Sequence, residues 1–314
     1  MPTNLTVTQA NTIQAIVNLF ETGHIRGDYG QVSVLDGDTG HLTFGRSQTT
    51  LGSGNLHRLL LRYCSSAGAR FGRRLSVVLA QIEAQDTGLD SDFKLHNVLR
   101  ATTDDPVMRD LQDEFFDETY FRPAMKAAER DGITLPLGRA VVYDSFVHGA
   151  WSRIRARVDG TPATRGQQEW VTEYLEARRA WLNTHPRPDL RASVYRIDAL
   201  KRLMVLGQWG LELPIVVRGA EISPTTLSEP PPGAFDGPHP GTRELAFQTS
   251  APLLRGLDVR LVQLALSERG ADVRADGVFG RASAICVGEY QRALGVTVTG
   301  VANRALVVEL AAEV

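Results

Sequence analysis

The chain has 314 residues, of which 43% are hydrophobic and 22% are charged, and its formal net charge is −2. It is long enough to bury a sizeable core and to form one large and one small domain. The balance of 34 basic against 36 acidic residues argues against nucleic-acid or anionic-membrane binding, since such proteins usually carry a basic surplus.

The N-terminal residues and the two cysteines indicate where the protein is synthesised. The first 20 residues lack the basic start and apolar stretch of a signal peptide, and no window approaches the roughly 18 apolar residues of a membrane span. The two cysteines, Cys64 and Cys286, lie far apart and form neither a disulfide framework nor a Cys-based zinc site. We therefore expect a soluble protein that is synthesised in the cytoplasm.

Composition divides the chain into three regions. Residues 1–218 contain long stretches with helical periodicity, and residues 219–250 are rich in proline and glycine. A run of this kind cannot sustain a helix or strand, so we expect an extended linker. Residues 251–314 return to apolar periodicity and are expected to form a small C-terminal domain.

The first elements are a helix and a hairpin. Residues 8–20 place apolar side chains at steps of three and four, with Thr8 or Asn11 as a possible cap and Gly23 at the end. Apolar and polar residues then alternate on both sides of the turn at residues 36–40, which is typical of a short hairpin. Further stretches with helical periodicity are Leu56–Tyr63, Leu75–Ala84, Pro106–Asp131, Leu137–Val158, Gln167–Leu182 and Val194–Leu206. The sequence thus predicts a mainly α fold with one small hairpin.

Two carboxylates in unlike surroundings stand out. Glu21 ends the first predicted helix directly after its apolar face, where burial would raise its pKa, as a general acid requires. The Asp-rich turn at residues 36–40 would hold a second carboxylate on a wetter loop that stays ionised. Such a pair is the minimal apparatus for breaking a glycosidic bond.

The segments around this pair resemble a known family. Residues 20–23, 29–30 and 38–46, and downstream Tyr143–Gly149, Glu176–Ala180 and Tyr195–Asp198, occur in the order of the active-site segments of glycoside hydrolase family 46, the chitosanases of the lysozyme-like superfamily. The resemblance covers most of residues 10–215. It implies a mainly α (α+β lysozyme-like) fold, with a helical two-lobed catalytic domain and a small β-hairpin.

The resemblance also implies roles for individual residues. Glu21 matches the general acid, and Thr43 matches the threonine that positions the attacking water. Counting back from Thr43, Asp38 rather than Asp36 matches the general base. Asp144, Arg178 and Arg196 match a buried ionic network behind the acid, which would fix its orientation. The family inverts the anomeric carbon, which requires carboxyl groups roughly 6.5–9.5 Å or more apart.

Further residues are expected to bind substrate or to support the site. The polar stretch at residues 46–56 would line the cleft beside the hairpin, where Gln48, Thr49 and Asn55 are placed to hydrogen-bond sugar hydroxyls or acetamides. The remaining residues in this group are Tyr29, Arg46 and His148, of which His148 is also compatible with a hydrogen-bonded core position. We expect Arg178 to point inward, because it follows the apolar Leu175.

The small C-terminal region resembles the three-helix peptidoglycan-binding domain found in many cell-wall hydrolases. A helix at residues 256–266 and a helix at residues 287–294 flank the Asp-Gly-Val-Phe-Gly turn at residues 276–280, and a third helix begins at Asn303. In such domains the groove lies near that turn, which makes Asp276, Phe279 and Gln291 candidate wall contacts. A small helical docking domain is the alternative interpretation.

No cofactor and no metal are predicted. Asp36 and Asp38 lack the Glu that completes a calcium loop. His24, His41 and His57 lack the i, i+4 spacing of a helical zinc pair.

Together these features predict an inverting endo-β-1,4-glycosidase that cleaves peptidoglycan glycan strands. A chitosanase with the same chemistry and a non-catalytic wall-binding protein remain open as alternatives, although the lack of an acidic surplus speaks against a cationic polymer. The partner is expected to be the polymer itself rather than a nucleic acid or a membrane. Without a visible signal peptide, delivery as a toxin or endolysin is a hypothesis, with an immunity protein or secretion machinery as further partners.

Overall fold

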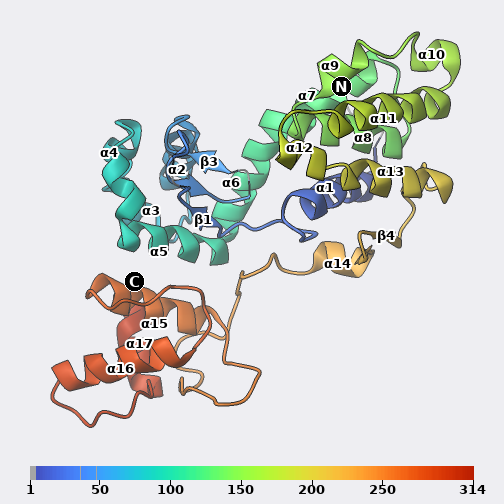
Figure 1. Ribbon diagram of the computed structural model, residues 1–314. Coiled ribbons are helices and arrows are strands. Elements are labelled where there is room, and N and C mark those ends of the chain that lie inside the picture. Colours follow the sequence, from blue (N-terminus) through green and yellow to red (C-terminus); the bar gives the residue numbers. More distant parts are fainter. Residues whose placement is uncertain (1–4, 36, 47) are drawn as a thin grey trace. The chain divides into compact units, whose positions relative to one another are not determined.

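The computed structural model describes residues 5–35, 37–46 and 48–314 (Figure 1). The fold is mainly α-helical with two small antiparallel sheets. The chain forms two compact units: the first comprises Met1–Gly27 and Phe116–Pro231, and the second comprises Asp28–Phe115 and Pro232–Val314. Within the described residues, no helix has the length and apolar character needed to cross a membrane.

The first unit is a helical bundle around one apolar core. Its longer helices are α1 (Val7–Glu21), α7 (Arg122–Arg130), α8 (Pro136–Val147), α11 (Gln167–Asn183) and α13 (Tyr195–Val205). Its shorter elements are the π-helical turn Asp117–Phe121, α9 (Trp151–Arg155), α10 (Pro162–Arg165), α12 (Pro188–Ala192), α14 (Pro224–Ser228) and the hairpin β4–β5 (Ile215–Val217, Ala220–Ile222). Helix α8 is buried along most of its length and contacts α1, α7, α11 and α13.

Helix α1 confirms the predicted apolar periodicity, but its start differs. Ile13, Ile16 and Val17 are fully buried in the core of the first unit. The N-cap is Thr6 rather than Thr8 or Asn11, because Thr6 and Gln9 form a reciprocal capping box.

The second unit contains the small sheet and its supporting helices. Strands β1 (Val32–Ser33), β2 (Thr43–Phe44) and β3 (Thr49–Thr50) pair antiparallel in the order β1-β2-β3, so the predicted hairpin is confirmed and gains a third strand. The helices of this part are α2 (Asn55–Ser65), α3 (Gly72–Ser76), α4 (Leu79–Glu83), α5 (Phe93–Ala101) and α6 (Pro106–Phe116), with 3₁₀ turns at Thr87–Ser91 and Thr102–Asp104. Leu42 and Phe44 lie in the core beneath the sheet.

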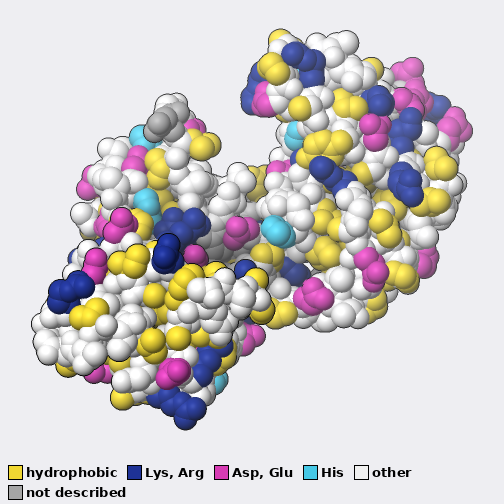
Figure 2. All heavy atoms as spheres, turned by 60° about the horizontal axis from the view of Figure 1, so that its bottom comes forward, with side chains coloured by type: hydrophobic (Ala, Val, Ile, Leu, Met, Phe, Trp, Pro, Cys, Tyr) yellow, Lys and Arg dark blue, Asp and Glu magenta, His cyan; other side chains and the backbone are white. Residues whose placement is uncertain are grey.

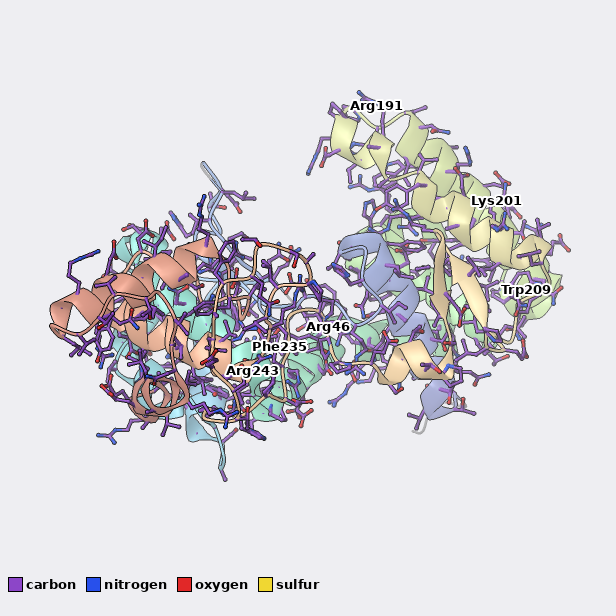
Figure 3. All side chains as sticks on the ribbon, turned by 90° about the horizontal axis from the view of Figure 1, so that it is seen from below. Arg46, Arg191, Lys201, Trp209, Phe235 and Arg243 are labelled. Carbon is purple, nitrogen blue, oxygen red and sulfur yellow. The ribbon has the colours of Figure 1, made fainter. Side chains whose placement is uncertain are left out.

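The C-terminal module, residues 232–314, belongs to this same unit. Its helices are α15 (Leu257–Glu268), α16 (Arg281–Ala293) and α17 (Arg304–Ala312), as the three-helix pattern predicted. Arg243, labelled in Figure 3, donates to both oxygens of the buried Asp258 at 2.8 and 3.0 Å and so ties the entry segment to α15.

The module packs directly on α5. Leu264 and Ala275 are buried in the same core as the apolar residues of α5. Asn97 of α5 donates to the Ser267 hydroxyl at 2.8 Å and accepts from the backbone amide of Ala275 at 3.0 Å. Helix α5 itself was not predicted from the sequence, because its apolar residues face two different partners.

Four predicted elements need correction. The stretch 75–84 is divided into α3 and α4 by a turn at residues 77–78. The stretch 106–131 is interrupted by a π-helical turn at Asp117–Phe121, and the stretch 137–158 is divided at Gly149, which adopts φ +81°. Residues 219–250 were expected to hold neither helix nor strand, yet they contain β5 and α14. Ser223 caps α14 and Pro224 occupies its first turn, where proline is favoured.

Candidate active site

Glu21 is the last residue of α1, and several contacts fix its position. The Tyr195 hydroxyl donates to the backbone carbonyl of Phe20 at 2.7 Å, and the buried Asn18 amide donates to Ile25 O at 2.8 Å in the loop that follows. The Glu21 side chain is 33% exposed. The carboxylate is thus held at the surface by a rigid helix end.

A buried ionic network lies behind this carboxylate. Arg196 donates to Glu21 at 2.6 Å and to Asp144 at 2.9 Å, and Arg178 forms an ion pair with the second oxygen of Asp144. Asp144 and Arg178 are fully buried. The sequence-based expectation that Arg178 points inward is confirmed, and α8, α11, α13 and α1 each contribute one member of this network.

The charges of this network stabilise one another. Burial alone would raise the pKa of Asp144, but the guanidiniums of Arg196 and Arg178 outweigh it and lower this pKa to about 2. Burial likewise opposes the charge of Arg196, yet the carboxylates of Asp144 and Glu21 raise its pKa. Asp144 and Arg196 are therefore charged near neutral pH.

His148 follows α8 next to this network. Its Nδ1 is buried without a hydrogen-bond partner in the described structure. Burial, together with the positive charges of Arg196 and Arg178, lowers the pKa of His148 to about 4. His148 is therefore a neutral side chain near pH 7.

The hairpin carries the second predicted carboxylate in the second unit. Asp38 is exposed, and its Oδ1 accepts from the backbone amide of Gly40 at 3.1 Å. Thr43 lies on β2 and donates to the His41 carbonyl at 3.0 Å. Asp36 and Ser47 lie outside the described residues.

Asp90, which was not singled out in the sequence, holds the hairpin from outside. Its two oxygens accept from the Leu42 amide at 2.7 Å and meet His41 Nδ1 at 2.8 Å. The hairpin also approaches Gly52 so closely that a Cβ there would lie 2.2 Å from the Thr39 carbonyl oxygen. A glycine is therefore required at that position.

The buried Tyr29 and Arg46 form a second cluster with the partly exposed Asp113. The Tyr29 hydroxyl and Arg46 Nη1 both donate to Asp113 Oδ1, and Arg46 is labelled in Figure 3. The fully buried Gln112 bridges the same segments, since it accepts from the Arg46 amide at 2.8 Å and donates to the Tyr29 carbonyl at 3.0 Å. Gln112 and Asp113 were not singled out in the sequence. Their polar side chains inside a stretch of helical periodicity are the signal that could have identified this cluster.

The polar stretch at 46–56 is only partly available to a ligand. Gln48 is exposed, and Asn55 at the start of α2 is half-buried and accepts from Arg58 at 3.3 Å. Thr49 differs from the expectation: it is 1% exposed, and its hydroxyl donates to the Phe44 carbonyl at 3.0 Å. Thr49 therefore fastens the sheet instead of facing a cleft.

The candidate wall contacts also need correction. Phe279 is fully buried in the core of the module. The buried Gln291 side chain binds the backbone of the loop at residues 299–301 and so builds the module's own structure. Asp276 is exposed, but one of its oxygens accepts from Gln263 and from the amide of Val278.

Charge is mixed over the molecular surface. Figure 2 shows blue basic and magenta acidic side chains interspersed over the visible face. Among the described residues, no group of three or more His, Cys, Asp or Glu side chains is arranged to hold a metal ion.

These features define a class of protein. A carboxylate at a helix end is held by a buried Arg–Asp–Arg network, and a separate hairpin carries a second carboxylate, within a mainly α fold of the lysozyme-like type. Glycoside hydrolases use two carboxyl groups on separate elements, one as an acid and the other as a base or nucleophile.

Comparison with known proteins identifies the family. Residues 15–215 match the profile of glycosyl hydrolase family 46, and the chain belongs to this family. Residues 255–310 match a putative peptidoglycan binding domain.

The relatives include characterised enzymes. A chitosanase of Bacillus subtilis (strain 168) is 26% identical over 230 residues, which cover 68% of this chain and 83% of the relative. The native chitosanase from Bacillus subtilis MY002 superposes with a TM-score of 0.56 at 24% identity, over 68% of this chain and 96% of that one. A family 46 chitosanase from Gynuella sunshinyii in complex with chitotetraose gives a TM-score of 0.54 at 28% identity, over 70% of this chain and 98% of that one.

Proposed function

We propose that this glycoside hydrolase cleaves the β-1,4 bonds of peptidoglycan glycan strands with inversion. In this reaction Glu21 protonates the leaving oxygen. Asp38 accepts a proton from a water molecule that Thr43 positions on the opposite face of the sugar. The ion pair of Glu21 with Arg196 supports the role of Glu21, because it fixes the direction of the acid.

The observation that favours peptidoglycan is the C-terminal module. It matches a peptidoglycan binding domain, and it packs on the unit that carries the hairpin with Asp38 and Thr43. A polymer held by the module is thereby kept at a high effective concentration near this hairpin. We propose residues 1–218 as the catalytic domain and residues 251–314 as the wall-binding domain, joined by residues 219–250.

Phe279 and Gln291 are buried, so we propose a different place in the module as the wall-binding surface, namely a groove. The groove has a volume of about 560 Å³ and lies between α16 and the loop at residues 298–301. Phe247, Ile285 and Val298 line it and are exposed. We propose these three apolar side chains as wall contacts, because apolar faces of this kind pack against sugar rings and peptide side chains.

Chitosan is the second candidate substrate. The relatives given above are chitosanases, and one of them was solved with chitotetraose. Both polymers are β-1,4-linked aminosugars, so the same pair of carboxylates serves either.

Purified sacculi and chitosan distinguish the candidates. We expect the full chain to release reducing ends from sacculi faster than from chitosan, with the cleaved bond identified by mass spectrometry of the products. Glu21→Gln and Asp38→Asn are each expected to reduce the rate at least about 100-fold, while Asp159→Asn, at an exposed carboxyl outside the proposed pair, serves as a control. A rate that neither variant lowers contradicts the assignment of the pair, and a chain that binds sacculi without cleaving either polymer is the non-catalytic alternative.

We further propose that the enzyme is delivered to the wall as a toxin or as an endolysin. A neighbouring gene for an immunity protein supports the first route, and a neighbouring holin gene supports the second.

A further inference from the structure

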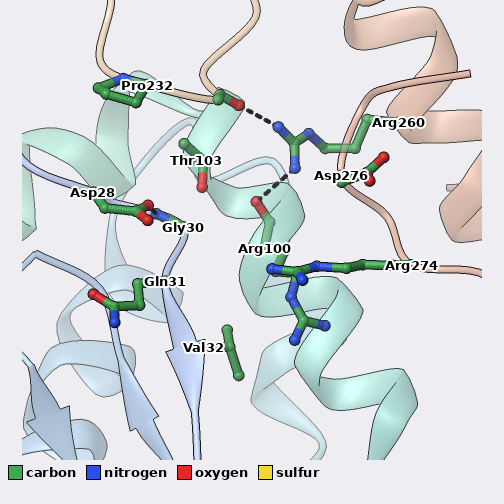
Figure 4. A pocket seen from close by; sticks show the side chains of 11 residues that line it. Asp28, Gly30, Gln31, Val32, Arg100, Thr103, Pro232, Arg260, Arg274 and Asp276 are labelled. Atoms are coloured by element: carbon green, nitrogen blue, oxygen red, sulfur yellow. Dashed lines mark hydrogen bonds between the residues drawn. The ribbon is translucent and has the colours of Figure 1, made fainter.

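A pocket of about 410 Å³ lies within the second unit, where the module meets the catalytic region (Figure 4). One wall is formed by the segment leading into β1, another by the end of α5, and the third by the module. Three arginines line it: Arg100 from α5, and Arg260 and Arg274 from the module.

Arg260 is occupied by protein partners. It forms an ion pair with Asp104 at 2.7 Å and donates to the carbonyl oxygens of Ala275 at 2.8 Å, Arg100 at 3.2 Å and Gly233. This guanidinium joins the walls of the pocket and has little capacity left for a ligand.

Arg100 and Arg274 are not satisfied in the same way. Figure 4 shows their guanidiniums side by side in the pocket. Among the described residues, Arg100 Nε is buried without a hydrogen-bond partner, and Nη1 donates to Asn97 at 3.2 Å. The part of the chain that the structure describes provides no side-chain partner for Arg274. Burial, and next the neighbouring charge of Arg274, lower the pKa of Arg100 to about 10.

The pocket also contains two acids, and the charge of Asp276 partly offsets the positive charge at Arg100. Asp28 accepts from the amide of Gly30 at 3.0 Å, and Asp276 accepts from Gln263 and from the Val278 amide, so both acids organise their own turns. Neither forms an ion pair with Arg100 or Arg274. Thr103 is 1% exposed, and its hydroxyl is also buried without a partner. Arg100 Nε and the Thr103 hydroxyl are buried donors that a ligand would satisfy, and the exposed guanidinium of Arg274 is available to the same ligand.

We propose that this pocket binds a carboxylate borne by the glycan strand, with Arg100 and Arg274 as its ligands. Guanidiniums form strong, directional hydrogen bonds with carboxylates. In peptidoglycan every second aminosugar carries a lactyl ether, whose carboxyl group is free or extended into a peptide stem, whereas chitosan carries only cationic amines. The pocket therefore selects peptidoglycan, and this inference rests on the proposed function.

The pocket is structurally connected to the hairpin. Val32 of β1 lines the pocket, and the next residue, Ser33, pairs with Thr43 on β2. A carboxylate bound by Arg100 and Arg274 thus anchors the glycan beside β1. The proposed water-positioning residue, Thr43, lies on the neighbouring strand β2. The pocket is a specificity element, distinct from the carboxylates that carry the reaction.

Binding measurements on the full chain test this proposal without any need for turnover. The Glu21→Gln protein is titrated calorimetrically with three probes: diacetylchitobiose, the N-acetylglucosaminyl-N-acetylmuramic acid disaccharide with a free lactyl carboxylate, and the same disaccharide with a dipeptide on the lactyl group. We expect the carboxylate probes to bind more tightly than diacetylchitobiose. Arg274→Gln and Arg100→Gln should each reduce that preference about tenfold.

Arg304→Gln is the matched control, because Arg304 is an exposed arginine of the same module outside the pocket. It should change the preference by less than about twofold. Tighter binding of the free lactyl probe identifies the lactyl carboxylate, and tighter binding of the dipeptide probe identifies the stem. An unchanged preference in both pocket variants overturns the proposal. If the preference falls but the active enzyme does not cleave sacculi, the pocket assignment stands and the proposed activity fails.

Discussion

Arg196 donates from Nη2 to Glu21 Oε1 at 2.6 Å and from Nε to Asp144 Oδ1 at 2.9 Å. One guanidinium therefore links the half-exposed carboxylate at the end of α1 to a carboxylate that no solvent reaches. The orientation of Glu21 depends on charges that belong to three other helices. This dependence makes the network a means of positioning the proposed acid.

Replacement of Arg196 by lysine tests whether its positive charge alone, or the directions of its hydrogen bonds, position Glu21. Arg196→Lys keeps the positive charge beside Asp144 but loses the two-directional hydrogen bonding. We expect kcat to fall about 100-fold with little change in KM, because a misdirected acid weakens the transition state more than substrate binding. Steady-state kinetics on the better of the two polymers measure both constants.

Arg179→Lys is the matched control, since Arg179 lies on α11 in an exposed ion pair with Asp198 at 2.9 Å and exposed pairs contribute little. An Arg196→Lys enzyme with wild-type kcat would show that the network does not position Glu21.

His148 predicts a pH dependence of stability. Its folded-state pKa of about 4 lies below the ordinary value of 6.5, so the unfolded chain binds more protons between these two values. Stability contributed by the neutral imidazole is therefore complete above pH 6.5 and is lost as the pH falls towards 4. Allowing for partial exposure, we expect a loss on the order of 1–2 kcal/mol, measured by urea unfolding at pH 6.5 and 4.5.

His148→Gln should remove most of this pH-dependent loss, because glutamine does not titrate. His24→Gln should retain it, since His24 is an exposed residue of the same unit. Equal pH dependence in wild type and His148→Gln would contradict the interpretation.

Much of the first unit follows from local patterns in the sequence. The apolar spacing of α1 predicts its buried face, and the position of Glu21 follows from it. The inward direction of Arg178 is predictable because apolar and small neighbours share its helix face. These features depend on contacts within one helix, for which periodicity is a reliable guide.

The features that were missed depend on contacts between different strands, helices and loops, which the periodicity of one element does not define. Phe279 belongs to the turn motif and Gln291 to α16, yet a motif does not distinguish a residue that builds the module from one that touches a ligand. Thr49 is polar but caps a strand carbonyl inside the sheet. The role of α5 arises only because the module covers it.

Asp90 provides a test of hairpin positioning. Asp90→Asn weakens the hydrogen bonds to the Leu42 amide and to His41, so the hairpin with Asp38 loses its external support. We expect faster hydrogen exchange at the Leu42 amide and an about tenfold lower kcat, with stability lowered by about 1–2 kcal/mol. Asp86→Asn, at the cap of the same 3₁₀ turn, should leave the exchange of Leu42 unchanged. Unaltered hydrogen exchange at the Leu42 amide in Asp90→Asn would show that the hairpin keeps its conformation without the contacts of Asp90.

Asp104 and Arg260 test how the module is attached. Both side chains are almost fully buried, and Asp104 also accepts from the Phe235 amide at 2.8 Å. Asp104→Asn leaves the Arg260 charge without its counter-ion, which should destabilise the packing of the module by about 3–5 kcal/mol. Limited proteolysis between residues 232 and 256 should then become faster. Asp236→Asn should have no such effect, because the Asp236 side chain is 70% exposed and lies 3.5 Å from Arg109.

The double variant Asp104→Asn with Arg260→Met distinguishes the loss of the ion pair from the loss of the hydrogen bonds that Arg260 donates to backbone carbonyls. Removing both charges eliminates the uncompensated cation, so the double variant should resist proteolysis better than Asp104→Asn alone. A double variant as sensitive as the sum of its two single variants would mean that hydrogen bonds to Gly233, Ala275 and Arg100 hold the module rather than the ion pair. In that case the hydrogen bonds of Arg260 to backbone carbonyls would hold the walls of the carboxylate pocket together. Arg260→Met alone would then separate these walls.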